Sequence, residues 1–229
     1  GFTVLRSRSG AVYSFGNGAS GSLGHGSDDD CWTPKQIEAL KSVNVSHIAA
    51  GPEHVLALAA GGEQLYAWGS NQDGRLGVGP DVAQALTPTP VVVPDDSRVT
   101  SISAGFAHSA LATEVGIAFT WGSNEDGQLG LDDDESRPLP TQVGGELDDV
   151  RVIGVKCCYQ STLFFCSDAD DRIDQWLLYC AGDSQQGQLG LGSLKVSRSP
   201  ARAVGVYNVL DAAVGERAGV ALVPRKPGK

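Results

Sequence analysis

The chain has 229 residues, of which 41% are hydrophobic and 19% charged, so it can bury a core and is not an intrinsically disordered protein. With a formal net charge of −10 the chain lacks the excess of Lys and Arg that binds nucleic-acid phosphates, and we expect no direct contact with nucleic acid. No apolar run reaches the roughly 18 residues of a membrane-spanning helix, so we expect no membrane span.

Cysteine usage indicates the redox compartment. The count is odd and no CxxC pair exists, which favours neither a disulfide framework nor a zinc site. We therefore expect reduced thiols in an intracellular protein, with cytoplasmic, nuclear and organellar compartments all left open. We expect no metal and no cofactor. The five cysteines are Cys31, Cys157, Cys158, Cys166 and Cys180.

Short extended segments follow one another along the chain, and none of it shows helical periodicity. In one unit of the chain we predict strands at 43–50, 54–60, 64–68 and from 87 onward. The next unit repeats the order, at 101–105, 108–113 and 117–121. About four short antiparallel strands per unit, joined by tight turns, predict an all-β fold, a β-propeller of four-stranded blades.

A glycine-rich segment recurs in four copies. Their central glycines, Gly21, Gly74, Gly127 and Gly187, follow one another at steps of 53, 53 and 60 residues, which indicates a repeat architecture. We interpret these segments as structural turns, because a phosphate loop would need a following helix. One leucine recurs in each copy, and we expect it to fill the contact between neighbouring units. These leucines are Leu23, Leu76, Leu129 and Leu189.

The segments 50–79 and 104–131 resemble the repeat of the regulator of chromosome condensation family, whose pattern is approximately AGxxHxxxLxxxGxxYxWGxNxxGQLGxG. The resemblance implies a propeller of about 50-residue repeats, seven-bladed in well-known members. We predict a propeller domain or propeller segment over 1–224 and a basic tail at 225–229, and we favour a segment because the chain begins inside a strand without Met. The predicted repeats lie near 2–53, 54–107, 108–158 and 159–217.

The units depart from the family pattern toward the ends of the chain. Phe2, His54, His108, Tyr159 and Ala218 stand at the family's histidine position. We expect His54 and His108 to be core or turn residues bonded to backbone, without a metal or catalytic role. A plant UV-B photoreceptor of the family uses a dense tryptophan cluster, whereas the four tryptophans here are dispersed by repeat and predict core packing. They are Trp32, Trp68, Trp121 and Trp176.

No GxSxG, HExxH or Walker motif is present, so we expect no enzymatic activity of the conventional kinds. We predict a non-enzymatic propeller that binds proteins, as a scaffold or adaptor in a larger protein or complex. The alternative is guanine-nucleotide exchange on a small GTPase, which the founding family member performs and which needs a binding face and no catalytic residue. An acidic chain fits a protein partner with a basic surface.

The third unit breaks the period, and its extra residues fall at 167–176. We predict a long hairpin there, with aspartates beside an aromatic side chain as a docking point for a basic partner. The alternative is a solvated surface insertion, because surface loops accept extra length at low cost. The predicted contact residues are Asp168, Asp170, Asp171, Asp174 and Trp176.

Two acidic runs follow the glycine segments at the same place in the repeat. Because equivalent positions of a propeller project from one face, we expect both runs to form an acidic face. The alternative is a set of scattered, solvated loops. The runs are Asp28, Asp29 and Asp30 in the first unit and Asp132, Asp133 and Asp134, followed by Glu135, in the third copy.

Overall fold

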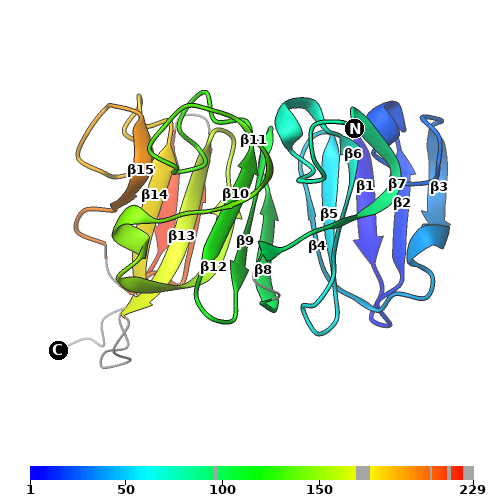
Figure 1. Cartoon of the computed structure of the whole chain (residues 1–229), viewed down its shortest axis with the longest axis horizontal. Helices are drawn as coiled ribbons and strands as arrows, with labels where there is room; N and C mark the ends of the chain where they lie inside the picture. The colour runs from blue at the N-terminus through cyan, green and yellow to red at the C-terminus, as the bar shows by residue number, and fades with distance from the viewer. Residues whose placement is uncertain (95–96, 169–175, 207, 216–217, 224–229) are drawn as a thin grey trace.

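A computed structural model of the chain describes residues 1–94, 97–168, 176–206, 208–215 and 218–223. Within those residues the regular structure consists of β-strands and single 3-10 turns (Figure 1). The described part contains no helix that is long and apolar enough to cross a membrane.

The strands form five antiparallel sheets in chain order. The first contains β1 (Phe2–Arg6), β2 (Val12–Gly16) and β3 (Cys31–Gln36). The second contains β4 (Val45–Ala50), β5 (His54–Ala59), β6 (Leu65–Ser70) and β7 (Gln84–Val91). The third contains β8 (Val99–Ala104), β9 (His108–Thr113), β10 (Ala118–Gly122) and β11 (Arg137–Gln142).

The fourth sheet contains β12 (Val150–Cys157), β13 (Ser161–Asp168), β14 (Trp176–Gly182) and β15 (Ser197–Arg202). The fifth contains β16 (Asp211–Val214) and β17 (Gly219–Leu222). In each complete sheet the strand order is the chain order, as it is in a propeller blade. The predicted all-β propeller architecture with four-stranded antiparallel blades is therefore confirmed.

The sheets stand side by side and touch through their first strands, with β4 against β8 and β8 against β12. In the second, third and fourth sheets the turns between first and second strands, and the glycine-rich loops between third and fourth strands, lie together at one edge, and in the three-stranded first sheet the glycine-rich loop between β2 and β3 lies at the same edge. We call this the loop edge; it is the upper edge in Figure 1. The hairpins between second and third strands of these three sheets, and the hairpin between β1 and β2 of the first sheet, lie at the opposite, hairpin edge.

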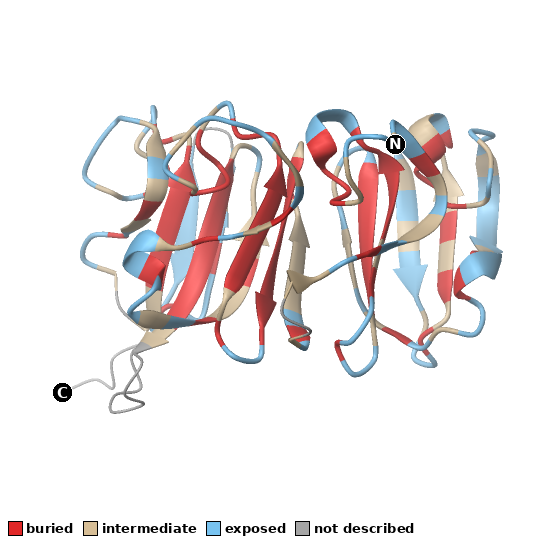
Figure 2. Ribbon diagram, in the orientation of Figure 1, coloured by how far each residue is buried: buried red, intermediate tan, exposed pale blue. Residues whose placement is uncertain are grey.

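Two tryptophans occupy the core and two do not. Trp68 and Trp121 are fully buried, as predicted, on β6 and β10, the third strands of the second and third sheets. Figure 2 shows how the buried residues gather on the inner strands of these sheets. The prediction was wrong for Trp32 and Trp176, which are 81% and 40% exposed. Trp32 lies on β3, the outermost strand of its sheet, where side chains have no further strand to pack against.

Each glycine loop packs on the next sheet, and we call each such contact a seam. The recurring leucine of the loop is buried in all four copies, as expected. In the second seam, between the second and third sheets, Gly77 lies so close to the Trp121 indole that a Cβ would stand 2.8 Å from Nε1. Gly74 has a φ of +81°, and the preceding Asp73 also adopts the left-handed conformation. The loop is therefore the structural turn that its sequence predicts.

The loop asparagine holds the turn at both ends. The buried Asn71 accepts a hydrogen bond from the Leu76 amide at 3.0 Å and donates to the carbonyls of Gly79 and Val82. In the next copy Asn124 accepts from the Leu129 amide at 2.9 Å. The side-chain amides of Asn71 and Asn124 thus provide hydrogen-bond partners for backbone groups that the turn would otherwise bury without one.

Candidate functional site

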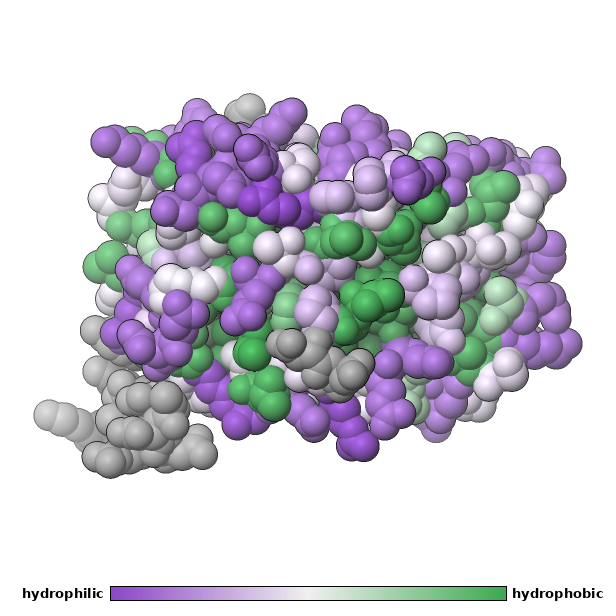
Figure 3. Space-filling model, in the orientation of Figure 1, coloured by the Kyte–Doolittle hydropathy of each residue, from purple (hydrophilic) through white to green (hydrophobic). Residues whose placement is uncertain are grey.

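The structure separates the predicted contact residues onto two edges. Both acidic runs belong to glycine-rich loops, which join β2 to β3 in the first sheet and β10 to β11 in the third, so they lie at the loop edge. The long hairpin joins β13 to β14 and lies at the hairpin edge. Figure 3 shows hydrophilic residues along the upper, loop edge of this view and apolar residues between the two edges. The acidic runs and the long hairpin therefore do not form one continuous surface for a partner.

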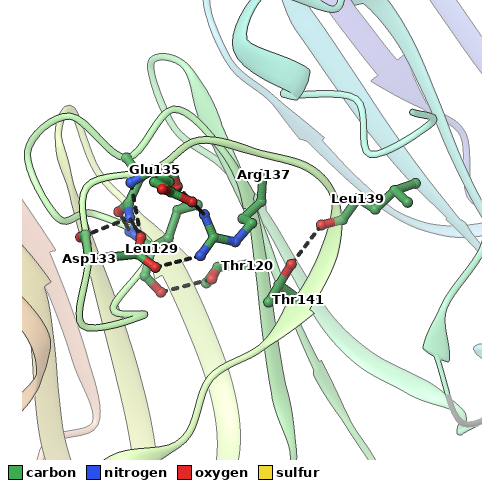
Figure 4. Close-up of polar contacts among 8 residues, drawn as sticks. Thr120, Leu129, Asp133, Glu135, Arg137, Leu139 and Thr141 are labelled. Carbon is green, nitrogen blue, oxygen red and sulfur yellow. Dashed lines mark hydrogen bonds and ion pairs between the residues drawn. The ribbon is translucent and has the colours of Figure 1, made fainter. Parts of the chain in front are cut away.

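The run 132–134 is bound into the architecture of its loop (Figure 4). Asp133 accepts a hydrogen bond from the Asn124 amide at 2.9 Å and pairs with Arg137 at 2.5 Å. Desolvation alone would raise the pKa of Asp133, but hydrogen bonds from the Glu135 amide, Arg137 and Asn124 together hold it below its usual value. Asp132 accepts from the Ser199 hydroxyl at 2.8 Å, and Asp134 pairs with Arg198 across the seam at 3.4 Å.

The run 28–30 is more open to solvent. Asp30 accepts a hydrogen bond from the Gly18 amide at 2.9 Å, so it closes the first glycine loop. Asp28 lies 3.5 Å from the Gln84 amide nitrogen of the neighbouring sheet. All three carboxylates, including that of Asp29, are exposed. They remain available as charge at the loop edge, and contact with a partner stays a prediction.

The long hairpin is described only at its base. Asp168 ends β13, with its backbone paired to Val150, and Asp170, Asp171 and Asp174 lie outside the described residues, as does the tail 225–229. Trp176 begins β14 and lines a hollow of about 260 Å³ beside Lys156 and Asp211, which form an ion pair. This hollow lies between the fourth and fifth sheets and does not reach the acidic runs.

A larger hollow that the sequence did not reveal lies at the loop edge. Its volume is about 430 Å³, and the second, third and fourth sheets all contribute to its lining. We call it the loop-edge hollow. Phe106 and Tyr159, from equivalent turns of two neighbouring sheets, line it with their ring centroids 4.8 Å apart and the rings tilted by 51°. Both side chains are exposed, at 44% and 41%, although they are large and apolar in part.

The predicted place of Tyr159 at the histidine position is wrong. His54 pairs with Gly69, His108 with Gly122 and Ser161 with Gly182, so Ser161 holds the histidine position in the fourth sheet. Tyr159 is then equivalent to Phe106, two residues earlier. The signal that pairs these two aromatics in the sequence is the distance from the preceding glycine loop, since Phe106 follows Gly74 by 32 residues (106 − 74) and Tyr159 follows Gly127 by 32 residues (159 − 127).

Charged residues complete the loop-edge hollow. Arg75 is almost fully buried, and it pairs with Glu53 at 3.0 Å and with Asp73 at 3.6 Å. Glu125 and Asp126 lie on the facing loop, and the Asp126 carboxylate accepts a hydrogen bond from Gln160 at 2.5 Å. Burial, followed by repulsion from Asp183 and Glu125, raises the pKa of Asp126 above its usual value. The hollow therefore has an excess of negative charge.

The two repeat histidines are part of the seams. His54 Nε2 lies 2.9 Å from the Ser109 hydroxyl, which donates to the Arg75 carbonyl at 2.8 Å. His108 Nε2 lies 3.0 Å from the Thr162 hydroxyl in the same arrangement one sheet further along. The expected core location is thus observed, with a hydroxyl group as the partner of each Nε2 atom.

Burial governs the protonation of these imidazoles. Desolvation lowers the pKa of His54 to about 3, with a smaller contribution from Arg75, and lowers that of His108 to about 4. Both rings are therefore neutral at physiological pH. In the described part of the chain no three His, Cys, Asp or Glu side chains gather as a metal site would require.

Comparison with known sequences agrees with the repeat pattern. The model of the "Regulator of chromosome condensation (RCC1) repeat" matches residues 9–58, 63–112 and 116–165. The chain is 38% identical over 197 residues to the ultraviolet-B receptor UVR8 of Arabidopsis thaliana, an alignment that covers 84% of this chain and 42% of the receptor.

Comparison with solved structures gives the same fold. Human WBSCR16 superposes with a TM-score of 0.82 at 24% identity, over 97% of this chain and 55% of that one. Prp20p of Saccharomyces cerevisiae, described with its binding to Gsp1p and histones, superposes with a TM-score of 0.77 at 22% identity, over 96% and 53%. The chain thus spans about half the length, or less, of the relatives it matches.

Proposed function

This chain belongs to the regulator of chromosome condensation repeat family, and from that premise we propose that it is a non-enzymatic propeller that binds a protein partner through its loop edge. One observation carries the proposal. Turns and glycine loops of three sheets together form a hollow in which exposed aromatic side chains stand beside acidic ones. Exposed aromatic residues in a concave, charged surround are typical of interaction surfaces rather than of solvated loops.

The proposal treats residues 1–224 as part of one propeller domain that serves as a scaffold or adaptor. Repeat folds present extended surfaces, and binding groups concentrate on their loops while the strands hold them in place. The strands beneath the hollow are held in place by side chains that are fully buried and hydrogen-bonded across the seams, namely His54, His108 and Trp121. A rigid frame lowers the entropic cost of binding a partner.

Affinity purification of the full chain with quantitative mass spectrometry tests this proposal. The double variant Phe106→Ser and Tyr159→Ser should lose a specific set of proteins that the wild type retains. Trp32→Ser is the matched control, because it also removes an exposed aromatic but lies on the outermost strand of the first sheet. Equal partner sets for wild type and the double variant would contradict a role for the loop edge.

A second candidate is guanine-nucleotide exchange on a small GTPase. The likeness to Prp20p, which is described with its binding to Gsp1p, favours it. Exchange requires only that the nucleotide-free GTPase be bound more tightly than the loaded one. Release of fluorescently labelled GDP from a panel of small GTPases distinguishes the two candidates, since a scaffold leaves every release rate unchanged.

A further inference from the structure

The aromatic pair of the loop-edge hollow is unusual for side chains of its size. Phe106 and Tyr159 pack against each other, and yet each keeps more than two fifths of its surface in solvent. Aromatic rings that are held in place by a neighbour present a fixed π-face. Such a face attracts a cation, and attracts the planar guanidinium group most readily.

The charges around these rings are unbalanced. Arg75 stands among four carboxylates that line the hollow, which leaves a formal charge of −3; the carboxylates belong to Glu53, Asp73, Glu125 and Asp126. Arg75 cannot serve the facing loop, because its guanidinium already binds Glu53, Asp73 and the Gln72 carbonyl. Among the residues that the structure describes, no ion pair includes Glu125 or Asp126.

We infer that the loop-edge hollow binds an arginine side chain from a basic, extended segment of the protein partner. The guanidinium would stack on Phe106 or Tyr159 and donate charge-assisted hydrogen bonds to Asp126 and Glu125. This inference rests on the proposed function, because it names the chemistry of the partner at the same edge. Lysine fits less well, since its ammonium group is more strongly hydrated and has no planar face.

The occupant is a protein segment and not a nucleic acid. Phosphate groups would meet the carboxylates of the hollow and a chain with a net charge of −10. A basic segment is instead attracted over several ångströms before contact, and that attraction weakens as salt screens it. The raised pKa of Asp126 agrees with a carboxylate that has no cation beside it.

Fluorescence anisotropy with three labelled nonapeptides tests the inference. Each peptide has a Gly-Ser background with three arginines, three lysines or three glutamates. We expect the arginine peptide to bind, the lysine peptide to bind at least threefold more weakly, and the glutamate peptide not to bind. Failure of the arginine peptide to bind at millimolar concentration, or equal affinity for arginine and lysine peptides, overturns the inference.

Two pairs of variants separate the hollow from general electrostatics. Glu125→Gln with Asp126→Asn removes two charges inside the hollow and should weaken arginine-peptide binding about tenfold. Asp28→Asn with Asp29→Asn removes two exposed charges from the same edge, outside the hollow, and should change it less than twofold. An equal loss in both pairs assigns the binding to the acidic edge as a whole and contradicts the inference.

The aromatic variants distinguish this inference from the proposed function. Phe106→Ser with Tyr159→Ser should also weaken arginine-peptide binding about tenfold, with thermal unfolding close to that of the wild type, since both side chains are exposed. If these variants lose the cellular partner while the arginine peptide never binds, the proposed function stands and the arginine inference fails. If the aromatic variants change neither the binding of the cellular partner nor that of the arginine peptide, both the proposed function and the arginine inference fail.

Discussion

The second seam and the fourth seam each contain a copy of the glycine loop, but the side chains around the two copies differ. In the second seam, between the second and third sheets, the Arg75 carbonyl accepts hydrogen bonds from Trp121 Nε1 at 3.0 Å and from Ser109. In the fourth, between the fourth and fifth sheets, the equivalent Gln188 carbonyl faces Gly219, where a Cβ would stand only 2.2 Å away. The hydroxyl and the imidazole of the second seam have no counterpart there.

The third seam lies between these two extremes. Thr162 donates to the Gln128 carbonyl at 2.6 Å and meets His108, but Ala181 stands where the second seam has Trp121. Nevertheless the loop geometry persists throughout, with a buried leucine and a left-handed glycine in each copy. Glycine and leucine therefore set the shape of a seam, whereas tryptophan, histidine and hydroxyl groups set how firmly it is held.

The largest test of this difference is the removal of the second-seam indole. Trp121→Ala should destabilise the chain by about 3–5 kcal/mol, because it leaves a cavity at a fully buried site and removes one donor to the Arg75 carbonyl. Chemical denaturation followed by circular dichroism measures the change. Trp32→Ala, at an 81% exposed site, should stay within about 0.5 kcal/mol of wild type. Similar values for the two variants would contradict the assignment.

Acid should act on the seams that contain histidine. The folded-state pKa values of His54 and His108, about 3 and about 4, lie below the usual value of 6.5. The unfolded chain therefore binds more protons as the pH falls below 6.5, and stability should drop by about 1.4 kcal/mol per pH unit for each histidine until the folded pKa is reached.

Denaturation at pH 7 and pH 5 measures this slope. His54→Gln should flatten it by about half, because one of the two buried imidazoles is removed. The exposed His47→Gln serves as control and should leave the slope unchanged. A wild-type stability that is equal at the two pH values would show that the imidazoles are not buried as neutral groups.

The equivalent glycines Gly77 and Gly190 sharpen the comparison further. Both have positive φ, at +73° and +67°, but a Cβ at Gly77 would meet the Trp121 indole at 2.8 Å while a Cβ at Gly190 would meet nothing within 4 Å. Alanine should thus cost about 2 kcal/mol more at Gly77 than at Gly190, because only the former adds overpacking to the backbone strain. Equal unfolding midpoints for the two variants would refute the difference between these seams.

The smallest expected effect concerns the hydroxyl in the second seam. Ser109→Ala should destabilise the chain by about 1.5 kcal/mol, because it leaves the buried His54 Nε2 without its partner. Urea denaturation at pH 7 measures it, and Ser42→Ala at an exposed position is the control. If both variants match wild type, the hydroxyl does not connect the histidine to the loop.

Local pattern alone predicted most of the fold. The predicted strand 108–113 coincides with β9. The predicted 54–60 is one residue longer than β5, and the predicted 117–121 is displaced by one residue from β10. Alternating apolar residues and turn glycines are local signals, so they can be detected without knowledge of the partner strand. The exposed Trp32 and Trp176 were missed because burial depends on which strand covers a residue, and sequence spacing does not contain that information.

The candidate site was much less predictable. The sequence indicated acidic runs and a long hairpin by composition, but all three aspartates of the run 132–134 form ion pairs or hydrogen bonds within their own loop and seam. The pairing of Phe106 with Tyr159 joins residues 53 positions apart, and Tyr159 was assigned to the wrong place in the repeat. A hollow formed by three sheets has no signature in any one of them.

By itself, the sequence determined the repeat, its strands and its glycine turns, because backbone conformation and strand periodicity depend on neighbours along the chain. Only the tertiary structure decided which edge carries each charge, which tryptophans are buried, and that Phe106, Tyr159 and Asp126 line one hollow. These properties depend on the stacking of one sheet against the next, which brings together side chains from different repeats.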